Sequence, residues 1–247
     1  ASSQGLRVKG SVSDFDWESI DRLIISPGVP HHFPLPHPIV SAAVSAGVLI
    51  DNDVGLFFQS IATKSWDKFS VRPRIVAVTG SNGKSTTASL LHHIFLKLGY
   101  KSQLAGNIGR GVLDIDPPEN NELLVLELSS YQIEVARILS PDLAIFTNFS
   151  ADHLERHGGI GGYLAAKRRL FTEGCPDYSI IGVDELAGLN LAQQLSASIG
   201  DDSIIRVSAT KQIRRFDWSI FRDGSYLIEH RKGKQISSLD LKIFDNF

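Results

Sequence analysis

The sequence predicts an α/β protein whose mostly parallel sheet is flanked by helices and followed by a small antiparallel meander. Segments typical of strands alternate with helical segments from residue 74 onwards. The strand segments are continuously apolar, as in Leu-Leu-Val-Leu at 123–126 and Leu-Ala-Ile-Phe at 143–146, which is typical of a parallel sheet buried on both faces. Near the end, glycine-containing turns separate the short segments 218–221 and 226–228, which is typical of antiparallel hairpins.

This alternation assigns each element of the sheet to a residue range. The predicted strands are residues 74–79, 102–105, 123–128, 142–148, 178–184 and 203–208. The predicted helices are residues 85–98, 130–139, 161–172 and 186–198. In the first of these helices, the residues that fall on one face are Leu90, Leu91, Ile94, Phe95 and Leu98, which is an amphipathic pattern.

A shorter unit precedes the sheet. Its predicted elements are a strand at 22–26, a rigid Pro-Gly-Val-Pro turn at 27–30, a helix at 39–46 and a strand at 48–50. This α/β rhythm has too few strands for a complete sheet, so we expect a partial Rossmann-like N-terminal domain over residues 1–70. The polar stretch 65–73 ends in Arg-Pro and fits a linker to a central domain over residues 71–247.

Composition places the chain among ordinary globular proteins. Its 247 residues suffice for one large or two ordinary domains, and 43% of them are hydrophobic and 21% charged. A formal charge of −2 gives no reason to expect nucleic acid or an anionic membrane as a partner. The single cysteine, Cys175, excludes an internal disulfide and fits a reducing compartment. No apolar run approaches the length of a membrane span, so we expect a cytoplasmic protein. We also expect a monomer.

The most informative segment is Thr-Gly-Ser-Asn-Gly-Lys-Ser-Thr at residues 79–86, between a predicted strand and a predicted helix. Strand, glycine turn and helix start form a cradle for nucleotide phosphates, because backbone N–H groups can approach the anion there. Lys84 can reach the outer phosphates, and a hydroxyl of Ser85 or Thr86 can bind Mg²⁺. The loop is shorter than the usual pattern because residue 78 is Val. The alternative is a plain strand–turn–helix connection with an exposed lysine.

Polar residues follow other predicted strands, where ligands bind in doubly wound sheets. Glu127 closes an apolar strand and needs a partner such as Mg²⁺ or, alternatively, a salt bridge or helix cap. Asp152 and His153 can bind a metal-bound phosphate, although a helix cap followed by a surface histidine is an equal reading. Lys167 alone reads as a solvated helix charge, and Asn107 alone as a loop residue.

Taken together, these segments resemble the Mur ligases, the ATP-dependent amide-bond-forming enzymes of peptidoglycan precursor synthesis. The segments that carry the resemblance are 26–30 (SPGVP), 79–86 (TGSNGKST), 106–109 (GNIG), 127–132 (ELSSYQ), 152–157 (DHLERH) and 163–167 (YLAAK). Folylpolyglutamate synthetases share the phosphate loop. The segments at 26–30 and 127–132 are narrower and point to the member that adds D-glutamate to UDP-N-acetylmuramoyl-L-alanine.

The resemblance implies a role for individual residues. The ATP phosphates would lie against the loop residues Gly80, Ser81, Asn82, Gly83, Lys84, Ser85 and Thr86. Ser85 and Glu127 would hold one Mg²⁺, and His153 a second. Lys167 would react with CO₂ to form a carbamate, an anionic ligand of the second metal. The residues that would line the muramoyl-alanine end of the substrate are Asn107, Ser129 and Gln132.

The implied reaction has two steps. The carboxylate of UDP-N-acetylmuramoyl-L-alanine attacks the γ-phosphoryl group of ATP to give an acyl phosphate, which the amine of D-glutamate then attacks as phosphate leaves. The catalytic residues would be Lys84, Glu127, His153 and Lys167.

The chain also departs from the family's pattern. The family's third, amino-acid-binding domain and its first strand are not in this sequence, so we expect a chain that is inactive alone. Gly55 stands where the family usually has Glu. The alternatives are another Mur ligase or a folylpolyglutamate synthetase, a nucleotide-binding module without ligase activity, and a non-catalytic structural domain.

Overall fold

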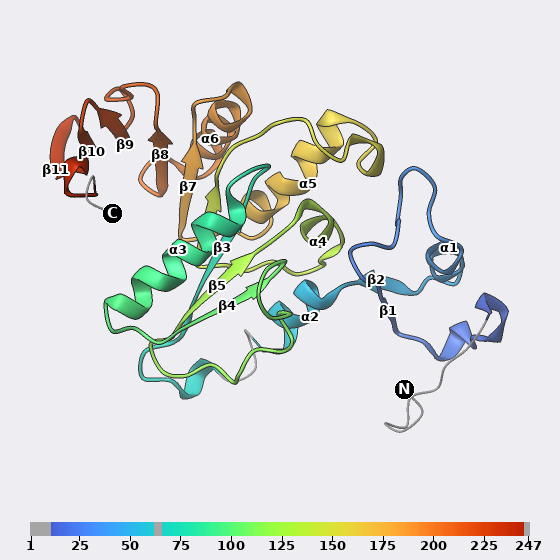
Figure 1. Cartoon of the computed structure of the whole chain (residues 1–247). Coiled ribbons are helices and arrows are strands. Elements are labelled where there is room, and N and C mark those ends of the chain that lie inside the picture. Colours follow the sequence, from blue (N-terminus) through green and yellow to red (C-terminus); the bar gives the residue numbers. More distant parts are fainter. Residues whose placement is uncertain (1–10, 62–65, 245–247) are drawn as a thin grey trace.

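The computed structural model describes residues 11–61 and 66–244, which form one large and one small sheet (Figure 1). The strands of the large sheet are β3 (Arg74–Thr79), β4 (Ser102–Gly106), β5 (Leu123–Glu127), β6 (Leu143–Phe146), β7 (Tyr178–Gly182), β8 (Ile204–Ser208), β9 (Trp218–Asp223), β10 (Tyr226–Arg231) and β11 (Lys234–Asp240). The helices are α1 (Pro38–Ser45), α2 (Asp53–Ser60), α3 (Lys84–Lys97), α4 (Ser130–Val135), α5 (Ile160–Thr172) and α6 (Leu186–Ile199).

The large sheet confirms the predicted fold class. Its strand order is β11-β10-β9-β8-β7-β6-β3-β5-β4, and all pairs from β4 to β9 are parallel. The last three strands form the antiparallel meander, which extends the same sheet because β9 pairs with β8. Its turns contain Gly224 and Gly233, both with positive φ, the left-handed conformation that hairpin turns require.

The small sheet consists of β1 (Arg22–Ile24) and β2 (Leu49–Asp51), which pair in parallel. Helix α1 connects these strands, and Pro38 occupies its first turn, where a missing N–H costs no hydrogen bond. Ile25 and Val40 pack with Val135 of α4, so this unit contacts the large domain through its own small apolar cluster. In Figure 1 it lies beside α2 and α4.

Alternate residues of β3 face opposite layers. Ile75 and Ala77 belong to the main hydrophobic cluster, which includes residues of α2, α4, α5 and α6. Val76 and Val78 belong to a smaller cluster with Ala88 of α3. The sheet is therefore buried on both faces, by several helices on one side and by α3 on the other, which explains the continuous apolar runs of its strands.

The predicted apolar face of α3 is only partly buried. Leu91 and Phe95 pack toward the sheet, whereas Leu90 is 55% exposed and Leu98 67% exposed. Ile94 is exposed as well. No described helix packs beside α3 over this face of the sheet, so only the inner stripe of the helix is buried.

Helix α4 ends at Val135, four residues before the predicted end at 139. Ala136 has non-helical backbone angles, φ −56° and ψ 124°. The guanidinium of Arg169 replaces the missing turn, because it donates to the carbonyls of Ile133, Glu134 and Ala136. The early end is thus stabilised by a residue from α5, a tertiary contact that local pattern cannot reveal.

Helix α2 was not predicted. Asn52 begins it by accepting a hydrogen bond from the N–H of Gly55. Val54, Phe57 and Phe58 are fully buried in the main cluster of the large domain. Residues 53–60 therefore pack into the core of the central unit, although the predicted boundary near residue 70 places them before it; that boundary stays a prediction. The predicted linker includes residue 65, which lies outside the described residues.

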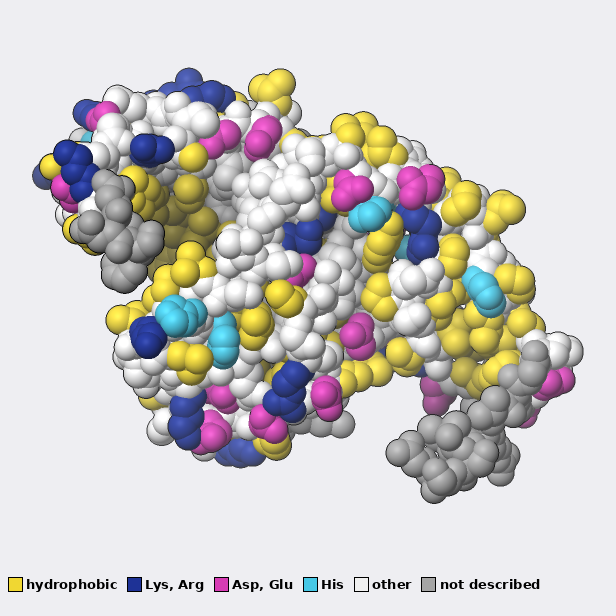
Figure 2. Space-filling view, in the orientation of Figure 1, with side chains coloured by type: hydrophobic (Ala, Val, Ile, Leu, Met, Phe, Trp, Pro, Cys, Tyr) yellow, Lys and Arg dark blue, Asp and Glu magenta, His cyan; other side chains and the backbone are white. Residues whose placement is uncertain are grey.

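The described helices include none that is long and apolar enough to cross a membrane. On the face shown in Figure 2, basic and acidic side chains are interspersed, and hydrophobic side chains gather around the β1–β2 unit.

Candidate functional site

The turn after β3 has the backbone geometry that a phosphate loop needs. Gly80 has φ +144°, and a Cβ there would lie 2.0 Å from the hydroxyl oxygen of Thr147. Gly83 has φ +75° and immediately precedes the first residue of α3. Residue 80 therefore needs glycine both for space and for its backbone conformation, and residue 83 needs it for the conformation alone. The N-terminus of α3 lies directly after them, where orphan N–H groups and the helix dipole favour an anion.

The end of β6 holds this loop in place. Asn148 accepts a hydrogen bond from the N–H of Asn82 at 2.9 Å and donates to the Asn82 carbonyl at 3.1 Å. The hydroxyl of Thr147 donates to the same carbonyl at 2.7 Å. Lys84 turns back over the loop, and its amine donates to the carbonyl of Ser81 at 2.8 Å. The loop is thus ordered by neighbouring residues, and the Lys84 cation lies above it.

Glu127 ends β5 next to the phosphate loop, because it pairs with Val78 of β3. Its side chain is 1% exposed. One carboxylate oxygen accepts from the amide of Asn107 at 3.1 Å, and the other is buried without a hydrogen-bond partner. A buried carboxylate oxygen without a partner carries a large desolvation cost, so this atom is suited to bind a cation. The salt bridge offered as an alternative from the sequence is not among the ion pairs of the described residues.

Lys167 is buried. Considered by itself in the sequence, it was interpreted as a solvated charge on a helix, and that interpretation is wrong. Lys167 lies on α5, is 1% exposed and donates to the carbonyl of Gly80 at 2.7 Å. Burial, together with the nearby positive charge of Lys84, lowers the pKa of its amine to about 7, and Asp152 opposes this shift. Near neutral pH a large share of these amines is therefore uncharged, as a nucleophilic lysine must be.

A cavity of about 140 Å³ brings five of the predicted site residues together, and Glu127 lies next to it through its contact with Asn107. The residues that line it are Lys84, Asn107, Ser129, Ser130, Tyr131, Asp152, His153, Tyr163 and Lys167. His153 is half-exposed, has a left-handed backbone (φ 49°), and lies 3.4 Å from a carboxylate oxygen of Asp152. No described group of three or more His, Cys, Asp and Glu side chains is arranged around a common metal position. That statement concerns only these four residue types. Ser85, a modified lysine and a bound nucleotide would supply metal ligands of other types.

Some predicted residues lie away from this cavity. Ser85 and Thr86 are exposed in the first turn of α3, outside its lining. Gln132 is buried in α4, and its side-chain oxygen accepts from the N–H and the hydroxyl of Ser129 at 3.0 and 3.1 Å. Together with the hydroxyl of Ser129, which caps the N–H of Gln132, this is a capping box. Helix capping therefore accounts for Gln132, and its contact with a substrate stays a prediction.

Two further side chains, Tyr163 and Arg156, belong to motifs noted in the sequence but received no role from it. Tyr163 approaches the hydroxyl of Ser81 to 3.2 Å, which connects α5 to the phosphate loop a second time. Arg156 donates to the carbonyl of Gly28 at 3.1 Å and stacks on Tyr131, with 4.9 Å from its guanidinium carbon to the ring centroid. It thereby fastens the Pro-Gly turn of the first unit to this cavity. The motif at 152–157 contains Arg156, but only tertiary structure shows its partner.

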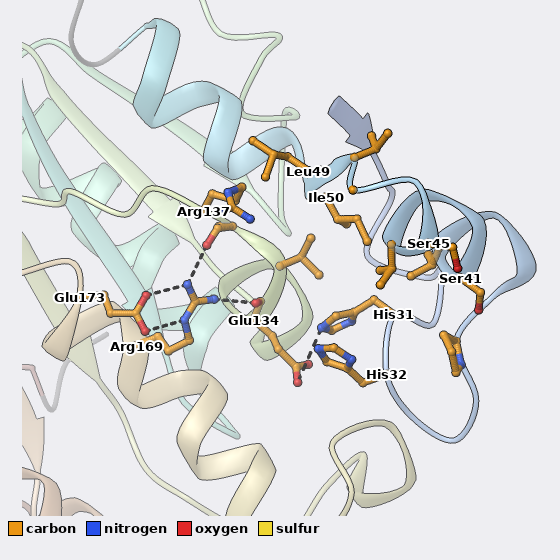
Figure 3. A pocket seen from close by; sticks show the side chains of 17 residues that line it. His31, His32, Ser41, Ser45, Leu49, Ile50, Glu134, Arg137, Arg169 and Glu173 are labelled. Carbon is orange, nitrogen blue, oxygen red and sulfur yellow. Dashed lines mark hydrogen bonds and ion pairs between the residues drawn. The ribbon is translucent and has the colours of Figure 1, made fainter. Parts of the chain in front are cut away.

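A second and larger cavity, of about 960 Å³, lies between the first unit and α4 and α5 (Figure 3). Its walls combine apolar residues of α1 and β2, including Val44 and Leu49, with charged residues such as Glu134 and Arg169. In Figure 3, Arg169 is engaged by Glu173 and by backbone oxygens, and His31 points toward Glu134. The smaller cavity is the better candidate for chemistry, because the phosphate-loop lysine and a buried amine line it, and the buried acid Glu127 contacts Asn107 in its wall.

The fold and the site define the chain as an α/β protein with a phosphate-binding loop between a parallel strand and a helix. Residues 78–244 match the model of the Mur ligase middle domain. The chain belongs to the Mur ligase family.

Relatives of known name are much alike in sequence. A UDP-N-acetylmuramoylalanine–D-glutamate ligase of Cereibacter sphaeroides (strain KD131) is 55% identical over 242 residues, which are 98% of this chain and 52% of that protein. The ligase of the same name from Ruegeria pomeroyi is 60% identical over 220 residues, covering 89% of this chain and 47% of that protein. The solved UDP-N-acetylmuramate-alanine ligase of Thermotoga maritima aligns with a TM-score of 0.46 and 19% identity, over 96% of this chain and 50% of that one. The chain spans about half the length of the curated relatives it matches.

Proposed function

We propose that this chain provides the ATP-binding core of a ligase that joins D-glutamate to UDP-N-acetylmuramoyl-L-alanine in peptidoglycan precursor synthesis. The observation that carries the proposal is that Lys84 and Lys167 line one cavity beside the phosphate loop, while Glu127 contacts Asn107 in the lining of the same cavity. A plain nucleotide-binding module has no need of a buried lysine at that place. The names of the relatives support the choice of substrates. The proposed enzyme is a cytoplasmic monomer.

The proposal includes two Mg²⁺ ions. The buried, unpartnered oxygen of Glu127 fits a cation, and Ser85 at the start of α3 would complete that site. His153 and a modified Lys167, which line the same cavity, would hold the second ion. When bound, the ions would neutralise charge on the transferring phosphoryl group.

We infer that Lys167 reacts with CO₂. The lone pair of the neutral amine attacks the carbon of CO₂, the nitrogen loses one proton to solvent, and an anionic carbamate results. Its lowered pKa, about 7, supports this step because only the neutral amine has a lone pair to donate. The modification replaces a cation, which would repel Mg²⁺, by two oxygen ligands.

In the proposed reaction Lys84 binds the β- and γ-phosphates, and Asn107 and Ser129 bind the muramoyl-alanine end of the substrate. The alanyl carboxylate attacks the γ-phosphorus and ADP leaves; the amine of D-glutamate then attacks the acyl phosphate, and inorganic phosphate leaves. The positioned charges around the loop stabilise the transferring phosphoryl group, which is the main contribution a protein makes to this chemistry.

The test is ATP-dependent phosphate release by the full-length parent protein, given UDP-N-acetylmuramoyl-L-alanine and a panel of amino acids. Release that requires both the nucleotide sugar and D-glutamate is the expected result. A requirement for another acid or amino acid would assign the chain to a sister ligase or a folylpolyglutamate synthetase-like enzyme. Hydrolysis that is indifferent to both would indicate a nucleotide-binding module without ligase activity.

A further inference from the structure

A buried histidine connects the two cavities. His157 lies at the end of the short helical turn 154–156, and its side chain is fully buried. Its Nε2 is 2.9 Å from the hydroxyl of Ser130, which lines the smaller cavity. Its Nδ1 is 2.9 Å from a carboxylate oxygen of Glu134, which lines the larger one. None of the three residues His157, Ser130 and Glu134 was a candidate site residue from the sequence.

The imidazole is fixed on all sides. Its ring stacks on Tyr131 at a centroid distance of 5.1 Å and an interplanar angle of 13°, and it contacts Tyr163 at 5.3 Å. Nδ1 and the Glu134 oxygen are close but are not aligned as a hydrogen bond, and neither atom has a hydrogen-bond partner among the described residues. On its far side Glu134 is 3.9 Å from Nε2 of His31, in the first unit (Figure 3).

For a neutral imidazole, these contacts determine which ring nitrogen carries the proton. A carboxylate only accepts hydrogen bonds, so the ring nitrogen that faces Glu134 must carry the proton. In the neutral ring Nε2 is then an acceptor, and the hydroxyl of Ser130 must donate to it. A hydroxyl that has already donated its proton offers only lone pairs to the cavity. Through His157, Glu134 therefore determines that the Ser130 hydroxyl donates to the imidazole and presents only acceptor lone pairs to the cavity.

We propose that Glu134 and His157 are positioning residues that hold the Ser130 hydroxyl as a hydrogen-bond acceptor for an N–H group of the bound substrate. This rests on the proposed function, and it assigns the N–H to the alanyl amide of the nucleotide sugar. Asn107 and Ser129, the residues proposed to bind that end of the substrate, line the same cavity as Ser130. A buried acceptor rejects a ligand that cannot donate, so the arrangement adds specificity.

The first test reads the tautomer in this chain, without any activity. Long-range ¹H–¹⁵N correlation spectra distinguish a protonated Nδ1 from a protonated Nε2, and His157→Phe identifies the signals by removing them. We expect a protonated Nδ1 and an unprotonated Nε2 in the wild type. In Glu134→Gln the amide can donate to Nδ1, so the proton should move to Nε2. A wild-type ring protonated at Nε2, whether or not Nδ1 is protonated as well, would overturn the proposal, because Nε2 would then donate to Ser130.

The second test measures the complete ligase. Because Glu134→Gln reverses the polarity of the hydroxyl and Ser130→Ala removes it, each should raise the KM for the nucleotide sugar roughly tenfold. The KM for ATP should stay within about twofold, because the phosphate loop is not altered. Glu155→Gln, the same substitution at an exposed neighbouring position, is the matched control and should leave both KM values unchanged.

The two tests separate the possible failures. If Glu134→Gln changes the tautomer but neither variant changes the KM for the nucleotide sugar, the role toward substrate is wrong. If both KM values rise together and the melting temperature falls, the chain of contacts is merely structural and the proposal is also wrong. If the wild-type ligase does not require the nucleotide sugar, the proposed function fails, and the tautomer experiment shows separately whether Glu134 orients His157.

Discussion

The amine of Lys167 donates a hydrogen bond to the carbonyl of Gly80, which joins helix α5 to the first glycine of the phosphate loop at 2.7 Å. The lysine is buried near the positive charge of Lys84, and Asp152 and the ring of Tyr163, whose centroid is 4.5 Å from the amine, compensate only part of its charge. The geometry of the phosphate loop and the protonation of Lys167 are therefore linked.

We expect Lys167 to make the stability of this chain depend on pH in CO₂-free buffer. The folded-state pKa is about 7 and the ordinary value is 10.5. Between these pH values the unfolded state binds a proton that the folded state does not, so stability rises with pH, by at most about 1.4 kcal/mol per unit. Below pH 7 both states are protonated and the penalty of burying the charge is complete.

Urea unfolding at several pH values between 7 and 10 measures this slope. Lys167→Met removes the titrating group and should flatten the curve, whereas Lys97→Met, in the last turn of α3, should retain it. Equal slopes in the wild type and in Lys167→Met would show that burial does not shift this pKa.

Lys84→Ala should weaken the binding of Mg²⁺-ATP to this chain by at least about tenfold, because it removes the cation over the phosphate loop. Calorimetric titration measures the affinity. Lys97→Ala, at the other end of the same helix, is the control for loss of one charge. Unaltered affinity in Lys84→Ala would exclude the phosphate role of the loop lysine, and absence of binding in the wild type would favour a non-catalytic structural domain.

Gly106→Ala should destabilise the fold by roughly 2 kcal/mol or more. Gly106 has φ +109°, and a Cβ there would lie 2.2 Å from the carbonyl oxygen of Glu127. Gly111→Ala is the matched control, since its Cβ would meet its nearest neighbour at 4.0 Å without a positive φ. The free energies of unfolding of the two variants in urea make the comparison, and equal losses would contradict the argument.

Much of the large domain was predictable because its signals are local. Burial on both faces makes the strands continuously apolar, and each range from β3 to β8 was predicted to within two residues at either end. The glycine turn after β3 and the acid at the end of β5 were recognised from local sequence, whereas only the family resemblance singled out Lys167; the roles of these residues stay predictions.

What was missed depends on contacts between distant segments. The early end of α4 is stabilised by Arg169, and α2 is held by burial of Phe57 and Phe58 in the core of the large domain. Ser130 and Glu134 lie one turn apart on α4, but His157 follows much later in the chain, so the three become a unit only when α4 and the turn before α5 pack together. No periodicity or spacing within the chain records such a contact.

The position of Asp51 explains why residue 55 is Gly in this chain, where the family usually has Glu. A Cβ at Gly55 would lie 1.9 Å from a carboxylate oxygen of Asp51. That carboxylate is fully buried; it accepts from Arg22 at 3.0 Å and from the backbone N–H groups of Asn52 and Arg137 at 2.9 and 3.1 Å. It connects β1, the start of α2 and the end of α4, and it occupies the space a larger residue at 55 would need.

Gly55→Ala should therefore destabilise the chain by roughly 2–4 kcal/mol, because displacing the carboxylate outweighs the gain of about 1 kcal/mol in helix propensity. Gly161→Ala, in the first turn of α5 where a Cβ would meet nothing within 4 Å, should be neutral or stabilising. Urea unfolding of the single and double variants completes a thermodynamic cycle. If the two side chains compete for one space, Asp51→Ala/Gly55→Ala should cost no more than Asp51→Ala alone, and additive losses would show that they do not.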